Sequence, residues 1–340
     1  MSIPVSQAMA ISSYIVKQKL SRNKRYPLVL MLEPLLRCNL ECGGCGKIQH
    51  PEEILSTYLT PEECWDAAEE CGAPMVSIAG GEPLIHPHID KIVEGLIERG
   101  KFVTLCTNAI LLERWLPKFT PSDHFSFTIH LDGMRDLHDA MVDRKGIFDK
   151  AVDGIRKAKA LGFRVNTNTT VFADSSTEEM RELFNFLADD LKTDGIVMSP
   201  GYDYPKAPNQ KVFMQRGQMI GKFQELLSLP ESKNWQFIDS PLFLEFLQGK
   251  VAMQCTAWGN PCRTVMGWQR PCYLMNEGYV PTYKQLMEET EWERYGYGRD
   301  ARCTNCMAHC GYEASAVEQT FKNPVQGIRA GVATLFGGRS

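Results

Sequence analysis

Cysteines are the residues of this chain with the clearest chemical potential, because nine of its twelve fall into two groups with metal-binding spacing. The first group is Cys38, Cys42 and Cys45. In a reducing compartment, clustered cysteines bind metal or do redox chemistry more often than they form disulfides. Three thiolates on one loop can hold three irons of a cubane cluster and leave the fourth iron open to another ligand. The alternative is a zinc site with His50 as fourth ligand.

The second group allows several interpretations. It comprises six cysteines, namely Cys255, Cys262, Cys272, Cys303, Cys306 and Cys310. The last three lie on one short segment, and one of the first three could supply a fourth ligand; we predict Cys272. A second [4Fe–4S] cluster, a structural zinc site and reduced thiols that only pack all agree with this spacing. The pattern favours a metal site, with iron ahead of zinc.

The elements that must position these residues alternate between strand and helix from residue 28 to residue 230. The predicted strands cover residues 28–32, 75–79, 102–106, 125–131, 163–171 and 195–198. The predicted helices cover residues 89–99, 110–116, 147–161, 176–191 and 215–227. A further helix begins with a capping box at Thr60 and Glu63, and Thr177 is the predicted cap of the helix over 176–191. Repeated βα units imply a parallel sheet with right-handed crossovers.

We therefore predict an α/β fold, a partial (β/α)6 barrel with a cysteine-rich C-terminal extension. The barrel covers residues 28–230, after an N-terminal helical segment over residues 1–27. Beyond residue 230 the alternation fades and Pro, Trp, Gly and Cys become frequent, so residues 231–340 are predicted to form a loosely structured second domain. In such barrels the functional residues lie at the carboxyl ends of the strands. The cluster loop, residues 38–46, follows the first strand and should lie there.

The C-x3-C-x2-C spacing after the first strand resembles the radical S-adenosylmethionine (SAM) superfamily. This resemblance implies a [4Fe–4S] cluster on Cys38, Cys42 and Cys45, with SAM as cosubstrate. It also implies an electron donor such as a flavodoxin or ferredoxin. The superfamily usually has an aromatic residue before the third cysteine, where this chain has Gly44. That departure weakens packing against the adenine of SAM but removes no iron ligand.

The resemblance also implies where SAM binds. Gly80, Gly81 and Glu82 match the glycine-rich motif that receives the SAM amino group, and Asn108 lies in a segment similar to the family's T-N-G. The other implied contacts are His130 and Asp132, where many relatives carry Ser-x-Asp-Gly, Arg144 for the carboxylate, and Asn168, Val197 and Met198 near the adenine. A solvated surface position is the alternative for Arg144, and core packing is the alternative for Val197 and Met198.

Four longer segments resemble the radical SAM proteins of hopanoid biosynthesis. They are CNLECGGCGKI (38–48), AGGEPL (79–84), TLCTNA (104–109) and CTNCMAHCGYE (303–313). This resemblance implies a hydrophobic triterpene substrate: the 5′-deoxyadenosyl radical adds to the alkene of diploptene and gives adenosylhopane. Two other classes remain open. One is a peptide-modifying or maturase radical SAM enzyme with an auxiliary cluster, and the other is a non-catalytic iron–sulfur carrier or zinc-binding scaffold.

Cys106 is the predicted hydrogen donor of this reaction. Radical addition to a terminal alkene leaves a tertiary radical on the substrate, and a thiol is a suitable hydrogen-atom donor to it. Strand alternation places Cys106 on the same face as Asn108, inside the barrel if Asn108 meets SAM. An isolated cysteine is otherwise usually a small buried hydrophobe.

Composition bounds the partners and the location. The formal net charge is −4 without a long run of either sign, which gives no indication of a nucleic-acid partner. We expect a cytoplasmic chain, because neither a secretory signal nor a spanning segment is evident. Residues 8–20 are predicted to form a helix whose apolar residues and following lysines and arginines suit the inner membrane face, assisted by residues 325–336. A helix that only packs on the barrel is the alternative.

Overall fold

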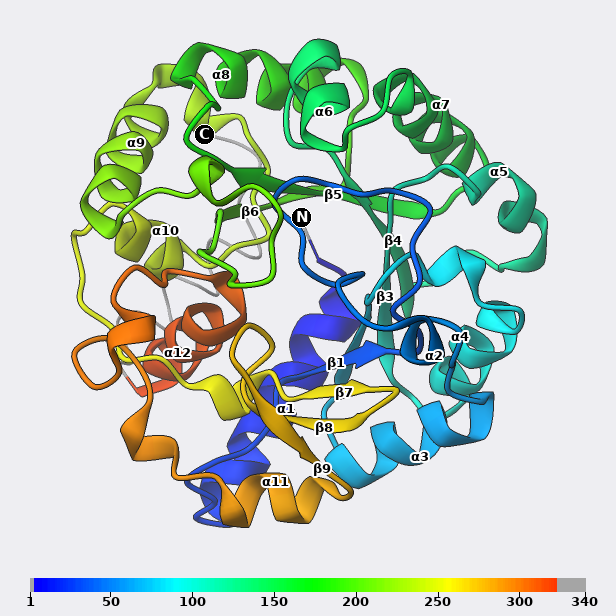
Figure 1. The fold of residues 1–340 in the computed structure, drawn as a ribbon, viewed down its shortest axis with the longest axis vertical. Coiled ribbons are helices and arrows are strands. Elements are labelled where there is room, and N and C mark those ends of the chain that lie inside the picture. Colours follow the sequence, from blue (N-terminus) through cyan, green and yellow to red (C-terminus); the bar gives the residue numbers. More distant parts are fainter. Residues whose placement is uncertain (1–2, 323–340) are drawn as a thin grey trace.

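The computed structural model describes residues 3–322, and it confirms the predicted α/β barrel (Figure 1). Six parallel strands lie side by side in the order in which they occur in the chain. They are β1 (Val29–Glu33), β2 (Met75–Ile78), β3 (Phe102–Thr107), β4 (Phe125–His130), β5 (Arg164–Val171) and β6 (Gly195–Pro200). Each agrees with its predicted range to within two residues. The predicted segment 325–336 lies outside the described residues.

Helices cover the outer face of this sheet and form the ring seen in Figure 1. They are α3 (Pro61–Cys71), α4 (Ile89–Glu98), α5 (Leu112–Trp115), α6 (Arg135–Met141), α7 (Ile147–Ala160), α8 (Thr177–Asn185) and α9 (Arg216–Ser228). The short helix α2 (Glu52–Leu55) has no buried residue and lies inside this ring in Figure 1. Alternate side chains of each strand pack under them: Leu30 and Leu32 of β1 are fully buried, whereas Val29 and Met31 face the barrel interior. The sheet therefore has a core on its outer side and a cavity on its inner side.

The helix ends test two capping predictions. The capping box of α3 is confirmed, with Thr60 accepting from the Glu63 N–H and Glu63 accepting from the Thr60 N–H. The predicted cap of α8 is wrong by one residue: Ser176 is extended and its hydroxyl accepts from the Glu179 N–H. Thr177 is instead the first helical residue, because a Ser-x-x-Glu pattern fits one position earlier.

The C-terminal third is more regular than predicted. It contributes β7 (Cys262–Thr264), β8 (Gly267–Pro271) and β9 (Asn276–Val280), and the helices α10 (Pro241–Leu247), α11 (Tyr283–Glu289) and α12 (His309–Lys322). The strand β7 pairs in parallel with β1, and β8 and β9 continue the sheet antiparallel, so one nine-stranded sheet runs from β6 to β9. Over residues 231–322, which the structure describes, the segment is therefore more ordered than expected. A three-residue strand such as β7 is defined by its distant partner rather than by local sequence.

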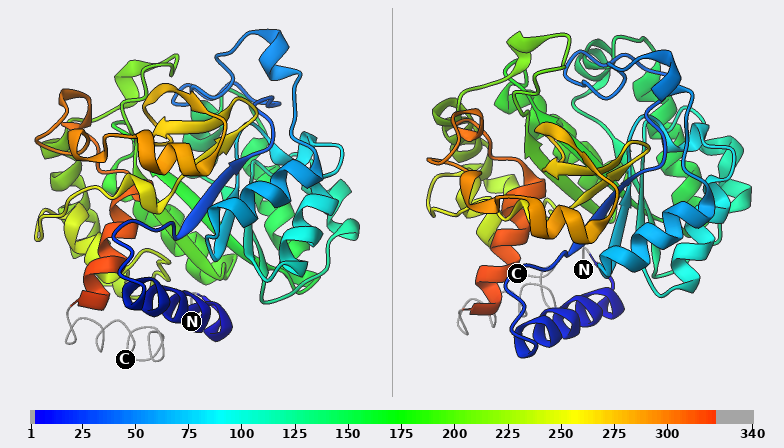
Figure 2. Two further views of the ribbon diagram at one scale, coloured as in Figure 1. Left: turned by 90° about the horizontal axis from the view of Figure 1, so that it is seen from below. Right: turned by 60° about the horizontal axis from the view of Figure 1, so that its bottom comes forward.

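Helix α1 (Val5–Leu20) lies across the amino-terminal end of the barrel, below the strands in Figure 2. It is anchored by Ile15, which is fully buried with Tyr26, Leu28 and Ala314. Within residues 3–322, no helix is long and apolar enough to cross a membrane.

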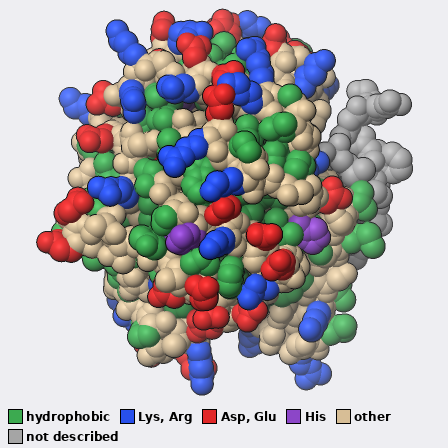
Figure 3. Space-filling model, turned by 90° about the vertical axis from the view of Figure 1, so that its right-hand side faces the viewer, with side chains coloured by type: hydrophobic (Ala, Val, Ile, Leu, Met, Phe, Trp, Pro, Cys, Tyr) green, Lys and Arg blue, Asp and Glu red, His purple; other side chains and the backbone are tan. Residues whose placement is uncertain are grey.

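The outer surface mixes charges of both signs. Figure 3 shows the face on the right of Figure 1, where Lys and Arg side chains are interspersed with Asp and Glu. This distribution agrees with the small net charge of −4.

Candidate active site in the barrel

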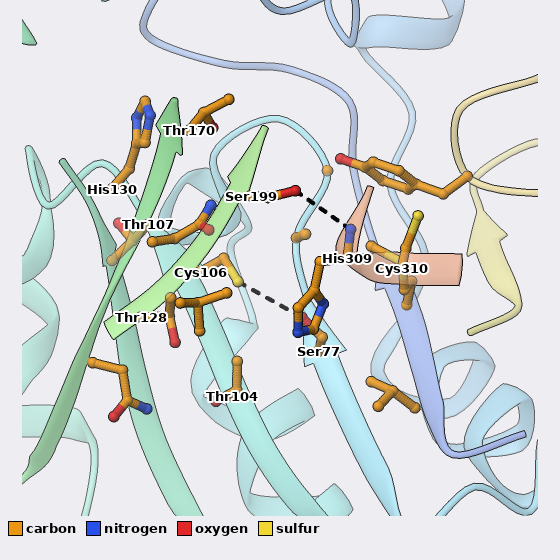
Figure 4. A pocket seen from close by; sticks show the side chains of 18 of the residues that line it. Ser77, Thr104, Cys106, Thr107, Thr128, His130, Thr170, Ser199, His309 and Cys310 are labelled. Atoms are coloured by element: carbon orange, nitrogen blue, oxygen red, sulfur yellow. Dashed lines mark hydrogen bonds between the residues drawn. The ribbon is translucent and has the colours of Figure 1, made fainter. Parts of the chain in front are cut away.

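A cavity of about 540 Å³ runs through the barrel along the whole length of its strands. At the carboxyl ends its wall includes Cys38, Cys42, Cys45, Glu82, Asn108, His130 and Asp132, and at the amino ends it includes Pro4, Met75, Phe102 and Arg164. Figure 4 shows the middle of this cavity, where hydroxyl groups of several strands surround Cys106. The cavity thus joins the motifs found in the sequence to the underside of the barrel near α1.

The three cysteines of the cluster loop converge on one end of the cavity, as predicted. All three are half-buried and line it. Burial raises the pKa of the Cys38 thiol to about 11 and also raises the pKa values of Cys42 and Cys45. Three such thiols would remain neutral alone, whereas coordination to iron stabilises the thiolates. The donor set therefore fits a cluster bound by three cysteines.

The glycines of the cluster loop permit close packing rather than left-handed turns. A Cβ atom on Gly44 would lie 2.7 Å from the ring of Phe172, and one on Gly46 would lie 2.1 Å from the ring of Tyr204. Neither glycine has a positive φ. Phe172, which follows β5, occupies the space beside Gly44. The aromatic group missing from the cluster loop is thus replaced by one from elsewhere in the chain.

The Gly80-Gly81-Glu82 segment packs directly against the chain that leads into the cluster loop. Gly80 has a φ of 109°, and a Cβ atom on Gly81 would lie 2.0 Å from the carbonyl oxygen of Arg37. Glu82 is 1% exposed, and its carboxylate accepts hydrogen bonds from Thr107 Oγ1 and from the N–H groups of Leu84 and Asn108. Burial raises the pKa of this carboxyl group, and these hydrogen bonds oppose the rise. Glu82 therefore fixes the end of β3 beside the cavity.

Asn108 connects that strand end to the cluster loop. Its Nδ2 donates to Asn39 Oδ1 at 2.7 Å and lies 4.0 Å from the sulfur of Cys38. The next residue, Ala109, has a φ of 63°, a conformation that favours glycine. This explains the similarity to a T-N-G segment, since the backbone takes the turn although the glycine is absent.

His130 and Asp132 form a pair at the end of β4. The His130 Nε2 lies 2.6 Å from Asp132 Oδ2, and Asp132 Oδ1 accepts from the N–H of Thr170. Burial alone would lower the pKa of His130, but the Asp132 charge outweighs it and the net pKa is raised. The site that many relatives fill with serine therefore holds an imidazole beside a carboxylate.

The remaining predicted SAM contacts divide into two pairs. Asn168 and Val197 line the cavity, in register with each other on β5 and β6. Met198 points away from it and is fully buried in the core, as strand alternation requires of the neighbour of Val197. Arg144 is not on the cavity wall either, and its guanidinium lies 3.4 Å from the carbonyl oxygen of Asn39 on the outside of the cluster loop.

The second cysteine group surrounds a separate small cavity. Its wall includes Cys255, Cys272, Cys303 and Cys306, whereas Cys310 lines the main cavity and Cys262 is buried in β7. Cys255 is close enough to α12 that a Cβ atom on Gly311 would lie 2.4 Å from its sulfur. Burial raises the pKa values of all four of these thiols. We therefore propose Cys255 as a further candidate ligand, beside the predicted Cys272, Cys303, Cys306 and Cys310, all of which act electrostatically on its thiol.

The described residues contain no compact set of three thiols at the spacing of a zinc site. A tetrahedral zinc ion with bonds of about 2.3 Å brings its sulfurs within about 3.8 Å of one another. Among the described residues, no three thiols lie within 4.8 Å of one another. In a cubane each thiolate binds a different iron, so wider spacing is required.

Iron content should show whether the second cysteine group binds a cluster. Anaerobically reconstituted protein is expected to contain about eight irons per chain, since each [4Fe–4S] cluster holds four. Replacement of Cys255 by Ala should lower this to about four and leave SAM cleavage measurable. Retention of about eight irons in that variant, or bound zinc in metal analysis, would contradict the assignment.

Two buried polar clusters lie outside what sequence reasoning found. Lys47 and Glu33 form an ion pair at 2.8 Å next to the cluster loop, with side chains 7% and 0% exposed. Asp239, His309 and Glu313 form a second cluster whose ligand atoms all lie within 4.8 Å. Burial raises the pKa values of both of its carboxyl groups, that of Glu313 to about 7. Glu33 and Lys47 lie on opposite sides of the cluster loop in the sequence, and Asp239 joins two residues of α12 from a distant segment, so no single motif indicates either cluster.

Comparison with known proteins agrees with this geometry. The model of the radical SAM superfamily matches residues 32–187, and a domain of unknown function (DUF3463) matches residues 196–330. The chain is 31% identical to a probable GTP 3′,8-cyclase of Methanocaldococcus jannaschii, over 76% of this chain and 89% of that protein. It is 28% identical to the Fe-coproporphyrin III synthase of Methanosarcina barkeri, over 40% of this chain and 35% of that protein.

Solved structures share the fold. The crystal structure of Streptococcus suis SuiB bound to the precursor peptide SuiA covers 92% of this chain and 77% of that chain, with a TM-score of 0.63 at 16% identity. The structure of anSMEcpe with bound AdoMet covers 90% of this chain and 100% of that chain, with a TM-score of 0.61 at 17% identity. At this identity the likeness concerns the fold alone.

Proposed function

Because this chain belongs to the radical SAM superfamily, we propose that it is an adenosylating enzyme that joins the 5′-deoxyadenosyl group of SAM to the alkene of diploptene and forms adenosylhopane. The proposal rests on the four segments that resemble hopanoid-biosynthesis proteins and on the position of Cys106 in the cavity. The cofactors of the superfamily are a [4Fe–4S] cluster and SAM, and the cysteine-rich C-terminal region fits a second cluster.

This chain's own residues would hold these groups at the carboxyl ends of the strands. Cys38, Cys42 and Cys45 would bind the cluster, and the wall around Glu82 and Asn108 would receive SAM. When bound, the two supply a 5′-deoxyadenosyl radical. An electron donor such as a flavodoxin or ferredoxin is needed for this step.

Cys106 is the observation that carries the proposal. Its thiol faces the cavity on β3, below Asn108, and lies 3.6 Å from the hydroxyl of Ser77 (Figure 4). Addition to a terminal alkene leaves a tertiary carbon radical on the substrate. Cys106 would donate a hydrogen atom to it from one side and so set the configuration of the new centre. An enzyme that regenerates SAM at the end of its reaction would not need a separate hydrogen-atom donor.

The cavity wall favours an apolar substrate over a nucleotide. A triphosphate, as the name GTP 3′,8-cyclase implies for the relative, requires several cations. The Lys and Arg residues on this wall are Lys47, which is paired with Glu33, and Arg164 at the far end of β5. Most of the wall that a ligand would touch is hydrocarbon. We therefore place diploptene ahead of a nucleotide.

A peptide-modifying reaction is the second candidate, favoured by the additional cysteine-lined cavity. Anaerobic incubation with SAM, reductant and either diploptene or GTP separates the candidates. We expect a covalent adenosyl–triterpene adduct by mass spectrometry. Absence of an adduct would refute the proposal, and a cyclised nucleotide from GTP would instead favour the reaction that the name of the relative implies.

The Cys106→Ala variant should still cleave SAM but should lose the adduct or give a mixture of epimers, because the hydrogen donor is absent. The matched control is Cys64→Ala, since Cys64 is an isolated cysteine on the buried face of α3, outside the cavity. Chromatographic separation of the adduct epimers measures the outcome. A single epimer in normal yield from Cys106→Ala would exclude this donor.

We also propose that α1 contacts the inner face of an anionic membrane, from which a triterpene must be taken. Its outward face carries Val5, Met9, Val16 and Leu20, which are 44% to 79% exposed. At 100° per residue these four lie within one narrow stripe, where a surface helix normally has polar groups. Lys17 and Arg22 lie at the end of this stripe, beside the headgroups of a lipid surface.

Liposome flotation tests this contact. At low salt, the wild-type protein should float with vesicles of anionic lipid, and the Met9→Ser/Leu20→Ser double variant should remain in the soluble fraction. Leu161→Ser, at a residue 55% exposed beyond α7, is the control and should float normally. Equal recovery of all three proteins in the soluble fraction would refute the contact.

A further inference from the structure

Three neighbouring strands place hydroxyl groups side by side on the cavity wall. Ser77 of β2 pairs with Thr104 of β3, and Thr104 pairs with Ser126 of β4. All three line the cavity and are half-buried, and Thr104 Oγ1 lies 2.6 Å from Ser126 Oγ. We refer to these residues as the hydroxyl row. Figure 4 shows Ser77 and Thr104 beneath Cys106.

The hydroxyl row begins at the thiol of Cys106 and leads toward the amino end of the barrel. Ser77 Oγ lies 3.6 Å from Cys106 Sγ, and Ser126 is in register with Arg164, the first residue of β5. The cavity there is also lined by Asp123 and His124. Barrel interiors are commonly filled by branched apolar side chains. Three hydroxyl side chains in register on neighbouring strands at this place therefore call for a functional reason.

An unsatisfied amide indicates that water reaches this wall. Asn166 of β5 lines the cavity beside the hydroxyl row and is 6% exposed. Its Oδ1 accepts no hydrogen bond from any described residue. A buried carbonyl oxygen without a partner is costly, and a cavity of this size, whose wall carries hydroxyl groups at this place, has room for a bridging water. Water beside Asn166 would connect to the hydroxyls of the row.

The proposed reaction leaves Cys106 in need of a proton. Hydrogen donation breaks the S–H bond, forms a C–H bond on the substrate and leaves a thiyl radical. One electron from the reductant that also serves SAM cleavage converts the thiyl to a thiolate, and one proton then restores the thiol. Burial raises the pKa of this thiol to about 11, so the thiolate takes up a proton readily if one can reach it.

We propose that the hydroxyl row is the proton route that restores Cys106 after each turnover, with Ser77 as the residue that hands the proton to the sulfur. This inference rests on the proposed function, in which Cys106 donates hydrogen. The row acts only after the substrate radical has been quenched. Its loss should therefore spare the first turnover of each enzyme molecule and slow the following ones.

Rapid-quench kinetics with the reconstituted holoenzyme, excess diploptene and excess reductant separate the first turnover from later ones. In the Ser77→Ala variant, one adduct per chain should form at the wild-type rate, and later adducts should form about a hundredfold more slowly, the low end for a positioned proton-transfer group. Thr104→Val should show the same pattern. Ser77→Thr should restore later turnovers because it keeps the hydroxyl.

Thr167→Val is the matched control, since Thr167 is a fully buried threonine of β5 outside the cavity wall. Equal slowing of first and later turnovers in Ser77→Ala and Thr104→Val would indicate packing and overturn the proton route. Unchanged later turnovers in both variants would overturn it as well. Absence of adduct from the wild-type enzyme would instead refute the proposed function, so the two failures are distinguishable.

Discussion

Replacement of Cys42 by Ser is expected to reduce SAM cleavage below detection. The three thiols of the cluster loop line one end of the cavity. In this variant, one iron of a cubane bound by three cysteines loses its protein ligand. Serine cannot replace a soft thiolate at iron. Quantification of 5′-deoxyadenosine after anaerobic incubation with SAM and dithionite measures the loss.

The iron count distinguishes the two cysteine groups in the same preparation. The Cys42→Ser variant should retain about four irons in the second site, since those thiols surround a separate cavity. The control Cys64→Ala should keep both full iron content and SAM cleavage. Normal formation of 5′-deoxyadenosine by Cys42→Ser would remove the cluster loop from the active site.

The sequence predicts the barrel well where local pattern determines structure. The sequence pattern predicts all of the strands β1 to β6, because buried parallel strands are short apolar runs flanked by turn residues. The sequence pattern does not predict the strands β7 to β9, because β7 becomes a strand only through pairing with β1. The same reasoning explains α8, where pattern locates the helix but leaves its first residue uncertain by one position.

The prediction of the site also succeeds for local motifs and fails for contacts between distant residues. The cluster loop and the Gly80-Gly81-Glu82 segment are contiguous motifs, and the structure brings them together as expected. Phe172 occupies the space beside Gly44 from more than a hundred residues away, and Cys255 joins the C-terminal thiols across the fold. Neither contact has a sequence signal. Strand alternation could have separated Met198 from Val197, since neighbours on a strand face opposite sides.

The buried ion pair of Lys47 and Glu33 leads to the second large effect, on stability. The Lys47 Nζ lies 2.8 Å from Glu33 Oε1 and 3.9 Å from the centre of the Tyr273 ring. Burial alone would lower the pKa of Lys47, but the Glu33 charge outweighs it and the net pKa is well above its usual value. Lysine therefore stays charged in the interior, two residues after Cys45, and depends on the carboxylate of Glu33.

The Glu33→Gln variant should lower the free energy of unfolding by about 3–5 kcal/mol, the usual cost of leaving a buried charge without its partner. Anaerobic urea unfolding measures this loss, and iron content should fall with it because Lys47 adjoins the cluster loop. The Glu33→Leu/Lys47→Met double variant should recover most of the stability, since an apolar pair of similar volume carries no unpaired charge. The control Arg181→Ala breaks surface ion pairs with Glu178 and Glu231 and should cost about 0–1 kcal/mol. A loss in Glu33→Gln no larger than in Arg181→Ala would show that the pair stabilises neither the fold nor the cluster loop.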